Sequence, residues 1–238
     1  MYNTKRLVLS SAAILLLAMA ACKKDSNNSS TTVTADDAAD AITQAVTPES
    51  AGLVAQTQTA TVIVSTGSYD CGIEKDTAFT GENVSGAAIT YSYAFSSSRL
   101  LTCNNGIPQS FAWNFLGKTS YDAPRISSGD SSRAQFTITG LQPSASRYVF
   151  NQSYIRYGSE ISKVRNKTSF TSTITIKTTD LTVDKASALI VSGTASVSIS
   201  GSTSSGRSFS YSGTITFLGN KQATLDLGNG NKYSIIWS

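Results

Sequence analysis

The chain has 238 residues, and its net charge of +4 is too small for bulk electrostatic binding of nucleic acid. It contains no histidine, which excludes Ser/His/Asp and Cys/His nucleophilic machinery and removes the commonest zinc ligand. Only 14% of the residues are charged and Ser and Thr are abundant, as in exposed β proteins outside the cytoplasm, so we expect a non-enzymatic protein without metal or cofactor.

Residues 1–21 have the composition of a secretory signal peptide, with two basic residues near the start followed by an apolar run. The run is too short to span a bilayer as a stable helix of the mature protein. It ends in the sequence LAMAAC at 17–22, which resembles the lipobox of bacterial lipoproteins. The resemblance implies that residues 1–21 are removed and that the Cys22 thiol carries a lipid.

The first residues after this cleavage site, CKKD at 22–25, resemble the start of mature outer-membrane lipoproteins from Bacteroidota-type bacteria. The resemblance implies an outer-membrane location, on the periplasmic face or on the cell surface, with the membrane as a partner through the lipid on Cys22. Residues 22–33 are almost entirely polar, and we expect them to form a flexible tether.

Residues 34–57 are predicted to form a short helical segment that packs on a sheet. The sequence TADD at 34–37 is a capping signature with acidic residues in the first turn, and small apolar residues then recur at helical spacing. A second start is indicated by TPE at 47–49, with Pro at the first helical position. We therefore predict helices over 35–46 and 48–55.

Residues 58–238 are predicted to form an antiparallel β domain, because apolar and hydroxyl side chains alternate, most clearly towards the C-terminus. The fold class is mainly β: a large twisted antiparallel sheet or sandwich of about ten strands, with one or two short N-terminal helices. Residues 118–133 are predicted to be a long exposed loop. The less regular early strands are predicted near 59–66, 87–96, 110–117, 134–140, 146–157 and 163–178.

Two cysteines remain after lipidation of Cys22. Outside the cytoplasm an even pair predicts a disulfide, between Cys71 and Cys103. A redox or metal pair is the alternative, but neither cysteine belongs to a C-x-x-C motif and no histidine is available to join them.

Lys163, Arg165 and Lys167 lie at spacing two, which would place them on one face of the strand predicted over 163–178. One interpretation is a cationic face for an anionic glycan or a lipid phosphate. The interpretation that we favour is a solvated face whose cations discourage pairing with another sheet edge.

Two further patterns concern the glycan chemistry of the chain. DTA at 76–78 resembles the three-residue O-glycosylation motif of secreted Bacteroidota proteins, which implies modification of Thr77. Aromatic residues occupy alternate positions over 91–95 and over 111–115. We expect these aromatics in the core, although exposed rings could stack on sugars.

The sequence favours a membrane-anchored lipoprotein with a structural or binding role. One alternative is a lipid- or lipoprotein-handling carrier, resembling the lipoprotein carrier fold, with an apolar cavity between sheet and helices. The other is a glycan-binding surface protein. An apolar cavity would favour the carrier, and a fully packed core would argue against it.

Overall fold

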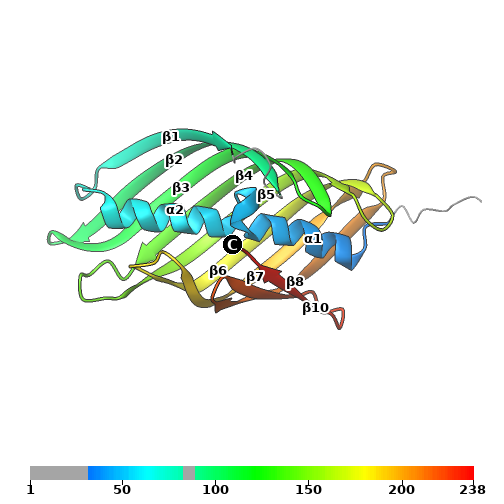
Figure 1. Cartoon of the computed structure of the whole chain (residues 1–238). Helices are drawn as coiled ribbons and strands as arrows, with labels where there is room; N and C mark the ends of the chain where they lie inside the picture. Colours follow the sequence, from blue (N-terminus) through cyan, green and yellow to red (C-terminus); the bar gives the residue numbers. More distant parts are fainter. Residues whose placement is uncertain (1–31, 83–88) are drawn as a thin grey trace, which may run out of the picture.

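The alternating segments of the sequence assemble into one antiparallel sheet. In the computed structural model, which describes residues 32–82 and 89–238, each strand pairs with its neighbours in the chain, in the order β1 to β10 (Figure 1). This confirms the mainly β fold class and shows a single open sheet rather than a sandwich. The strands are β1 (Glu74–Glu82), β2 (Thr90–Asn104), β3 (Ile107–Asp122), β4 (Ile126–Thr139), β5 (Arg147–Ser162), β6 (Ser169–Asp184), β7 (Ile190–Thr203), β8 (Ser208–Gly219), β9 (Gln222–Asp226) and β10 (Lys232–Ile236).

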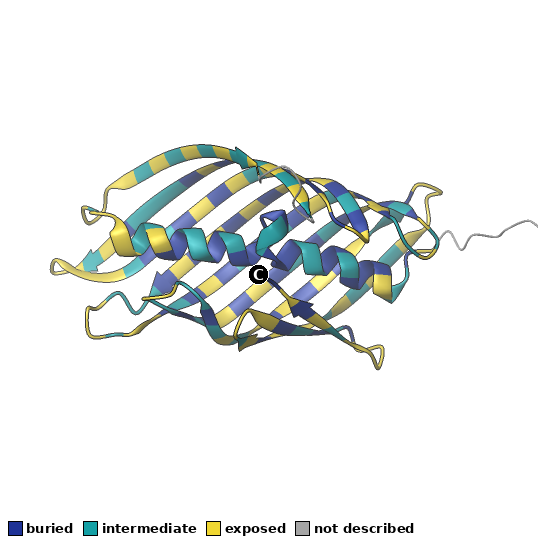
Figure 2. Ribbon diagram, viewed as in Figure 1, coloured by how far each residue is buried: buried dark blue, intermediate teal, exposed yellow. Residues whose placement is uncertain are grey.

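The sheet has a buried inner face and an exposed outer face, visible as alternating bands along the strands (Figure 2). Along β4 the pattern is almost perfectly two-fold, because successive side chains of a strand point to opposite faces. Trp113, Phe136 and Phe150 are at most 1% exposed and form the centre of the core on the inner face. The outer face carries mainly Ser, Thr and amide side chains and is exposed to solvent, whereas the inner face is covered.

The cover on the inner face is a helix layer made of α1 (Ala35–Val46), the 3-10 turn η1 (Pro48–Ser50) and α2 (Leu53–Thr66), which lie end to end across the curved sheet (Figure 1). The helix predicted over 35–46 is confirmed, whereas the helix predicted over 48–55 is wrong, because η1 ends at Ser50 and α2 begins only at Leu53. The capping box of α1 joins Thr34 and Asp37, and Ile42 is fully buried. None of the described helices is long and apolar enough to cross a membrane.

The strand predicted over 59–66 is wrong, because these residues belong to α2, and the helical segment therefore extends beyond residue 57. The run is rich in β-branched residues, which favour strands. Here the Thr57, Thr59 and Thr61 hydroxyls each donate to the carbonyl four residues earlier, at 2.8 Å. Their polar atoms are thereby satisfied within the helix, so burial against the sheet outweighs strand propensity.

The long exposed loop predicted over 118–133 is also wrong. These residues form the end of β3 and the start of β4, joined by a tight turn in which the Ala123 amide donates to the Ile126 carbonyl. The alternation was hidden because polar side chains, among them Ser128, Asp130 and Ser132, point inward on β4. Strand β1 was missed for a different reason, since it is an edge strand without a fully buried face.

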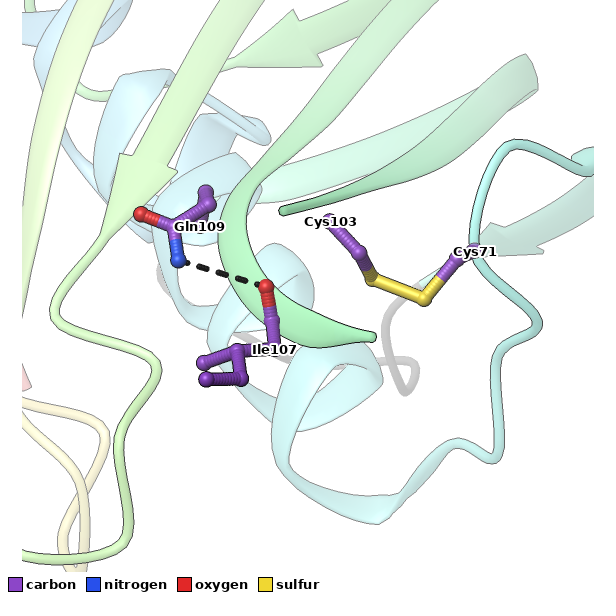
Figure 3. The surroundings of a disulfide bond; sticks show 4 residues. All are labelled: Cys71, Cys103, Ile107 and Gln109. Carbon is purple, nitrogen blue, oxygen red and sulfur yellow. Dashed lines mark hydrogen bonds between the residues drawn. A yellow bond between two sulfur atoms is a disulfide. The ribbon is translucent and has the colours of Figure 1, made fainter. Parts of the chain in front are cut away.

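The predicted disulfide is confirmed. Cys71, just before β1, is bonded to Cys103 near the end of β2 (Figure 3). The Cα atoms are 5.6 Å apart and the sequence separation is 32 residues. The bond therefore joins the segment between α2 and β1 to the C-terminal end of β2.

We expect Cys71→Ser combined with Cys103→Ser to lower the free energy of unfolding by about 3 kcal/mol, because the bridge removes loop-closure entropy from the unfolded chain. Urea unfolding of the two proteins measures the difference. Reduction of the unmutated chain should give the same loss. An unchanged unfolding midpoint would contradict a stabilising role for the bond.

Candidate functional site

A buried arginine lies at the centre of the contact between the helix layer and the sheet. The Arg156 side chain, on the inner face of β5, is 3% exposed, and its Nε is 2.7 Å from a carboxylate oxygen of Asp130 on β4. The same guanidinium donates to the Gln44 carbonyl at 2.7 Å and to the Ser50 carbonyl at 3.0 Å. One side chain thus joins two strands to the point where α1 gives way to η1.

A second carboxylate lies beside this pair. Glu160 is two positions after Gly158 on β5, and a Cβ at Gly158 would lie 2.2 Å from Glu160 Oε1 and 2.5 Å from Asp130 Oδ1. The missing side chain of Gly158 therefore makes the space in which the two acids meet. Ser128 donates to Asp130 and Ser172 donates to Glu160, while Glu160 Oε2 is buried and has no hydrogen-bond partner among the residues that the structure describes.

The charges of this buried cluster do not balance when both acids are ionised, because one guanidinium faces two carboxylates. Burial raises the pKa of Glu160 to about 7, against the lowering effect of the Ser172 hydroxyl. Burial also raises the pKa of Asp130, although the positive charge of Arg156 opposes that shift. Glu160 is therefore the group that accepts a proton first as the pH falls.

The buried cluster is closed to solvent, since Arg156 and Glu160 are each 3% exposed and Asp130 is 8% exposed. A general acid or base must lie within hydrogen-bond reach of its substrate. The helix layer covers these carboxylates, and Arg156 is bonded to that layer. We interpret the cluster as a structural contact that holds the helix layer on the sheet.

The common strand face expected for Lys163, Arg165 and Lys167, on which both interpretations of these residues depended, is wrong. These residues lie in the turn between β5 and β6, not on a strand, and Arg165 and Lys167 have positive φ angles that break the two-residue period. Lys163 pairs with Asp122, and Arg165 pairs with Asp37 at 2.9 Å and with Asp40. Two of the three cations are therefore already neutralised by the protein.

The other predicted positions have mixed outcomes. Thr77 lies on β1, is half-buried and donates its hydroxyl to the Asp76 carbonyl at 2.8 Å, and its modification stays a prediction. The aromatics expected in the core over 111–115 are buried, and so is Phe95, whereas Tyr91 and Tyr93 are half-buried on the inner face of β2. Cys22 lies outside the described residues, so its lipidation also stays a prediction.

The outer face of β1 to β5 carries two adjoining hollows of about 850 Å³ and about 700 Å³, which we call the surface hollow. Leu116, which is 62% exposed, and Arg133 line both parts. The register places one row of side chains across the hollow, one from each strand: Ala78, Ser96, Leu116, Arg133 and Ile155. Small side chains on β1 and β2 beside larger ones on β3 to β5 leave the depression.

The row beside it is polar. Asn114 and Gln135 are paired across β3 and β4, and Ser98 and Ser153 continue the row on β2 and β5. Apolar surface next to a few hydroxyl and amide groups is typical of a small-molecule site. Sequence reasoning missed this hollow because its members are far apart in the chain and only the strand register brings them together.

Comparisons with protein-family models, with curated proteins and with solved structures found no match for this chain.

We expect the free energy of unfolding to depend on pH through Glu160. Its pKa rises from an ordinary value of 4.5 to about 7 on folding, so the folded state binds the proton more tightly. Its contribution is greatest below pH 4.5 and is lost as the pH rises towards 7, by up to about 3 kcal/mol. Urea unfolding at several pH values between 5 and 8 measures this slope.

The matched variant is Glu160→Gln, which keeps the acceptor for Ser172 and resembles the protonated acid. Its stability should equal that of the unmutated chain near pH 5 and exceed it at pH 8. Parallel pH curves for the two proteins would show that Glu160 is not the titrating group.

Gly158→Ala should lower the free energy of unfolding by about 1–3 kcal/mol, because the added Cβ overlaps both carboxylates. Gly129→Ala on the neighbouring strand is the control, since a Cβ there meets nothing within 4 Å. Thermal unfolding of both variants provides the measurement. If the two variants are equally stable, the carboxylates of Asp130 and Glu160 do not lie against Gly158.

Proposed function

We propose that the chain is a lipid-anchored, non-enzymatic binding protein of the outer membrane or cell surface, and that its ligand is a glycan held in the surface hollow. The observation that carries the proposal is the hollow itself, which spans five strands on the face that the helix layer leaves open. The anchor rests on the resemblance of residues 17–25 to lipoprotein sequences.

The packing of the inner face favours an outer site over the lipid-carrier alternative. A side chain that lines an acyl-sized cavity has surface open to a water-sized probe. Many apolar side chains of the helix layer and of the sheet beneath it have no such open surface. The residues that are 0% exposed include Ala38, Ile42, Ala45, Leu53, Ala60, Phe111, Trp113, Ile138 and Phe150. The space that a carried lipid would need is filled at these positions.

The chemistry of the surface hollow suits a sugar chain. Leu116 and Tyr157, a residue that is 40% exposed, offer apolar surface to the C–H face of a sugar. Asn114 and Gln135 offer amide donors and acceptors to its hydroxyls. The larger hollow, at about 850 Å³, has the volume of a typical ligand pocket.

The test is binding of the full chain to an array of short neutral and uronic-acid-containing oligosaccharides, followed by titration calorimetry with the tightest binder. Leu116→Ser should weaken binding roughly tenfold, the effect of losing about 1.4 kcal/mol of apolar contact. Leu218→Ser is the matched control, because Leu218 on β8 is 56% exposed and lies outside the hollow.

The unmutated chain and Leu218→Ser should bind alike. Failure of the unmutated chain to bind any oligosaccharide would overturn the proposal, and equal losses in both variants would move the site away from the surface hollow.

A further inference from the structure

The surface hollow contains a cation that the protein does not neutralise. Arg133 on β4 lines both parts of the hollow and makes no salt bridge among the described residues. Lys118 on β3, which lines the smaller part only, and Lys177 on the outer face of β6 make none either. Lys163 and Arg165 differ in this respect, since each is paired with a carboxylate. Arg99, on the inner face of β2, is likewise without a salt bridge among the described residues, but its guanidinium lies over the Tyr69 ring and does not reach the hollow.

Within the described strands, the register places no acid next to Arg133. Its cross-strand partners are Leu116 and Ile155, and its neighbours along the same face of β4 are Ser131 and Gln135. A cation placed among these groups has no local counter-charge, so its field is directed into the hollow.

The acid that lines the hollow is remote from the guanidinium. Asp76 lies on β1, in the row of Gln135, so three strand spacings or about 14 Å separate it from β4. This exceeds the screening length of about 8 Å at physiological ionic strength. Asp76 therefore leaves the charge of Arg133 available to a ligand.

The guanidinium also has a defined position. It lies over the Tyr157 ring, 5.8 Å from the ring centre, on the boundary between the two parts of the hollow. A cation–π contact holds its plane near the sheet without using its N–H donors. Those donors match the two oxygens of a carboxylate, which a guanidinium binds in a bidentate manner.

We propose, resting on the function proposed above, that the ligand of the surface hollow is an acidic saccharide, and that Arg133 selects its carboxylate. The row of Ala78, Ser96, Leu116 and Ile155 on either side of Arg133 provides contacts for the sugar units that flank the acidic one. A free phosphate or a small acid would use Arg133 and leave that row empty.

The experiment compares oligogalacturonate with its methyl ester, which has the same sugar units but no charge. Titration calorimetry of the full chain should give at least tenfold tighter binding of the acid form. Arg133→Gln should remove this preference and bind both forms as weakly as the ester. Arg207→Gln has the same net charge, changes an exposed arginine outside the hollow, and should retain the preference.

Each outcome decides between the two proposals. Equal binding of acid and ester by the unmutated chain, or a preference that survives in Arg133→Gln, would overturn the role of Arg133 while the glycan site stands. Binding to neutral array members alone would do the same. Inorganic phosphate that competes as strongly as the acid saccharide would show a simple anion site and overturn the saccharide part. Absence of any glycan binding would reject the proposed function itself.

Discussion

The contact of the Arg156 guanidinium with both layers is the constraint on which the rest of the structure depends. A buried ion pair adds little stability over a well-packed apolar contact, but removing one partner costs about 3–5 kcal/mol. Its main effect is therefore on specificity. Because Arg156 bonds the Gln44 and Ser50 carbonyls, the break between α1 and α2 has one favourable position on the sheet. The backbone is tight there, since a Cβ at Gly52 would lie 2.7 Å from the Ala45 carbonyl oxygen.

Further polar contacts between the helix layer and the sheet reinforce this central contact. Asp37 at the start of α1 accepts hydrogen bonds from Ser162 and Arg165, and Gln152 donates to Thr57 of α2 at 2.8 Å. Near the first described residues, the Tyr211 hydroxyl donates to the Val33 carbonyl. The layer is thus tied to the sheet from its start to the first turns of α2, which leaves the outer face as the surface that can receive a ligand without rearrangement.

The sequence predicted those parts of the fold whose signals are local. The capping box of Thr34 and Asp37 indicated α1, and the alternation near the C-terminus indicated the late hairpins. The β3–β4 hairpin was missed because Asp130 and its serine neighbours occupy inward positions that normally carry apolar residues. Asp130 pairs with Arg156 on the next strand and accepts a hydrogen bond from Ser128, and a pattern read along one segment cannot show that requirement.

The candidate site shows the same limit more sharply. Spacing alone put Lys163 and Arg165 on one strand face, but Asp37 is 128 residues from Arg165 in the chain and neutralises it. Arg133 gave no signal, because its lack of an acidic neighbour depends on which residues stand opposite it on β3 and β5. Charge complementarity at a sheet face is a property of register, so it can be predicted only after the strand pairing is known.

Register also explains why the surface hollow occurs where it does. The pairing from β1 to β5 shifts between Thr102 and Cys103, towards the disulfide end, and is uninterrupted over the rows that form the hollow. An irregularity within those rows would turn Leu116 or Arg133 towards the core, since a slip of one residue exchanges the two faces. The regular pairing that buries Phe115 and Ala134 therefore also fixes the outward positions of Leu116 and Arg133, and the same register determines the core and the proposed binding surface.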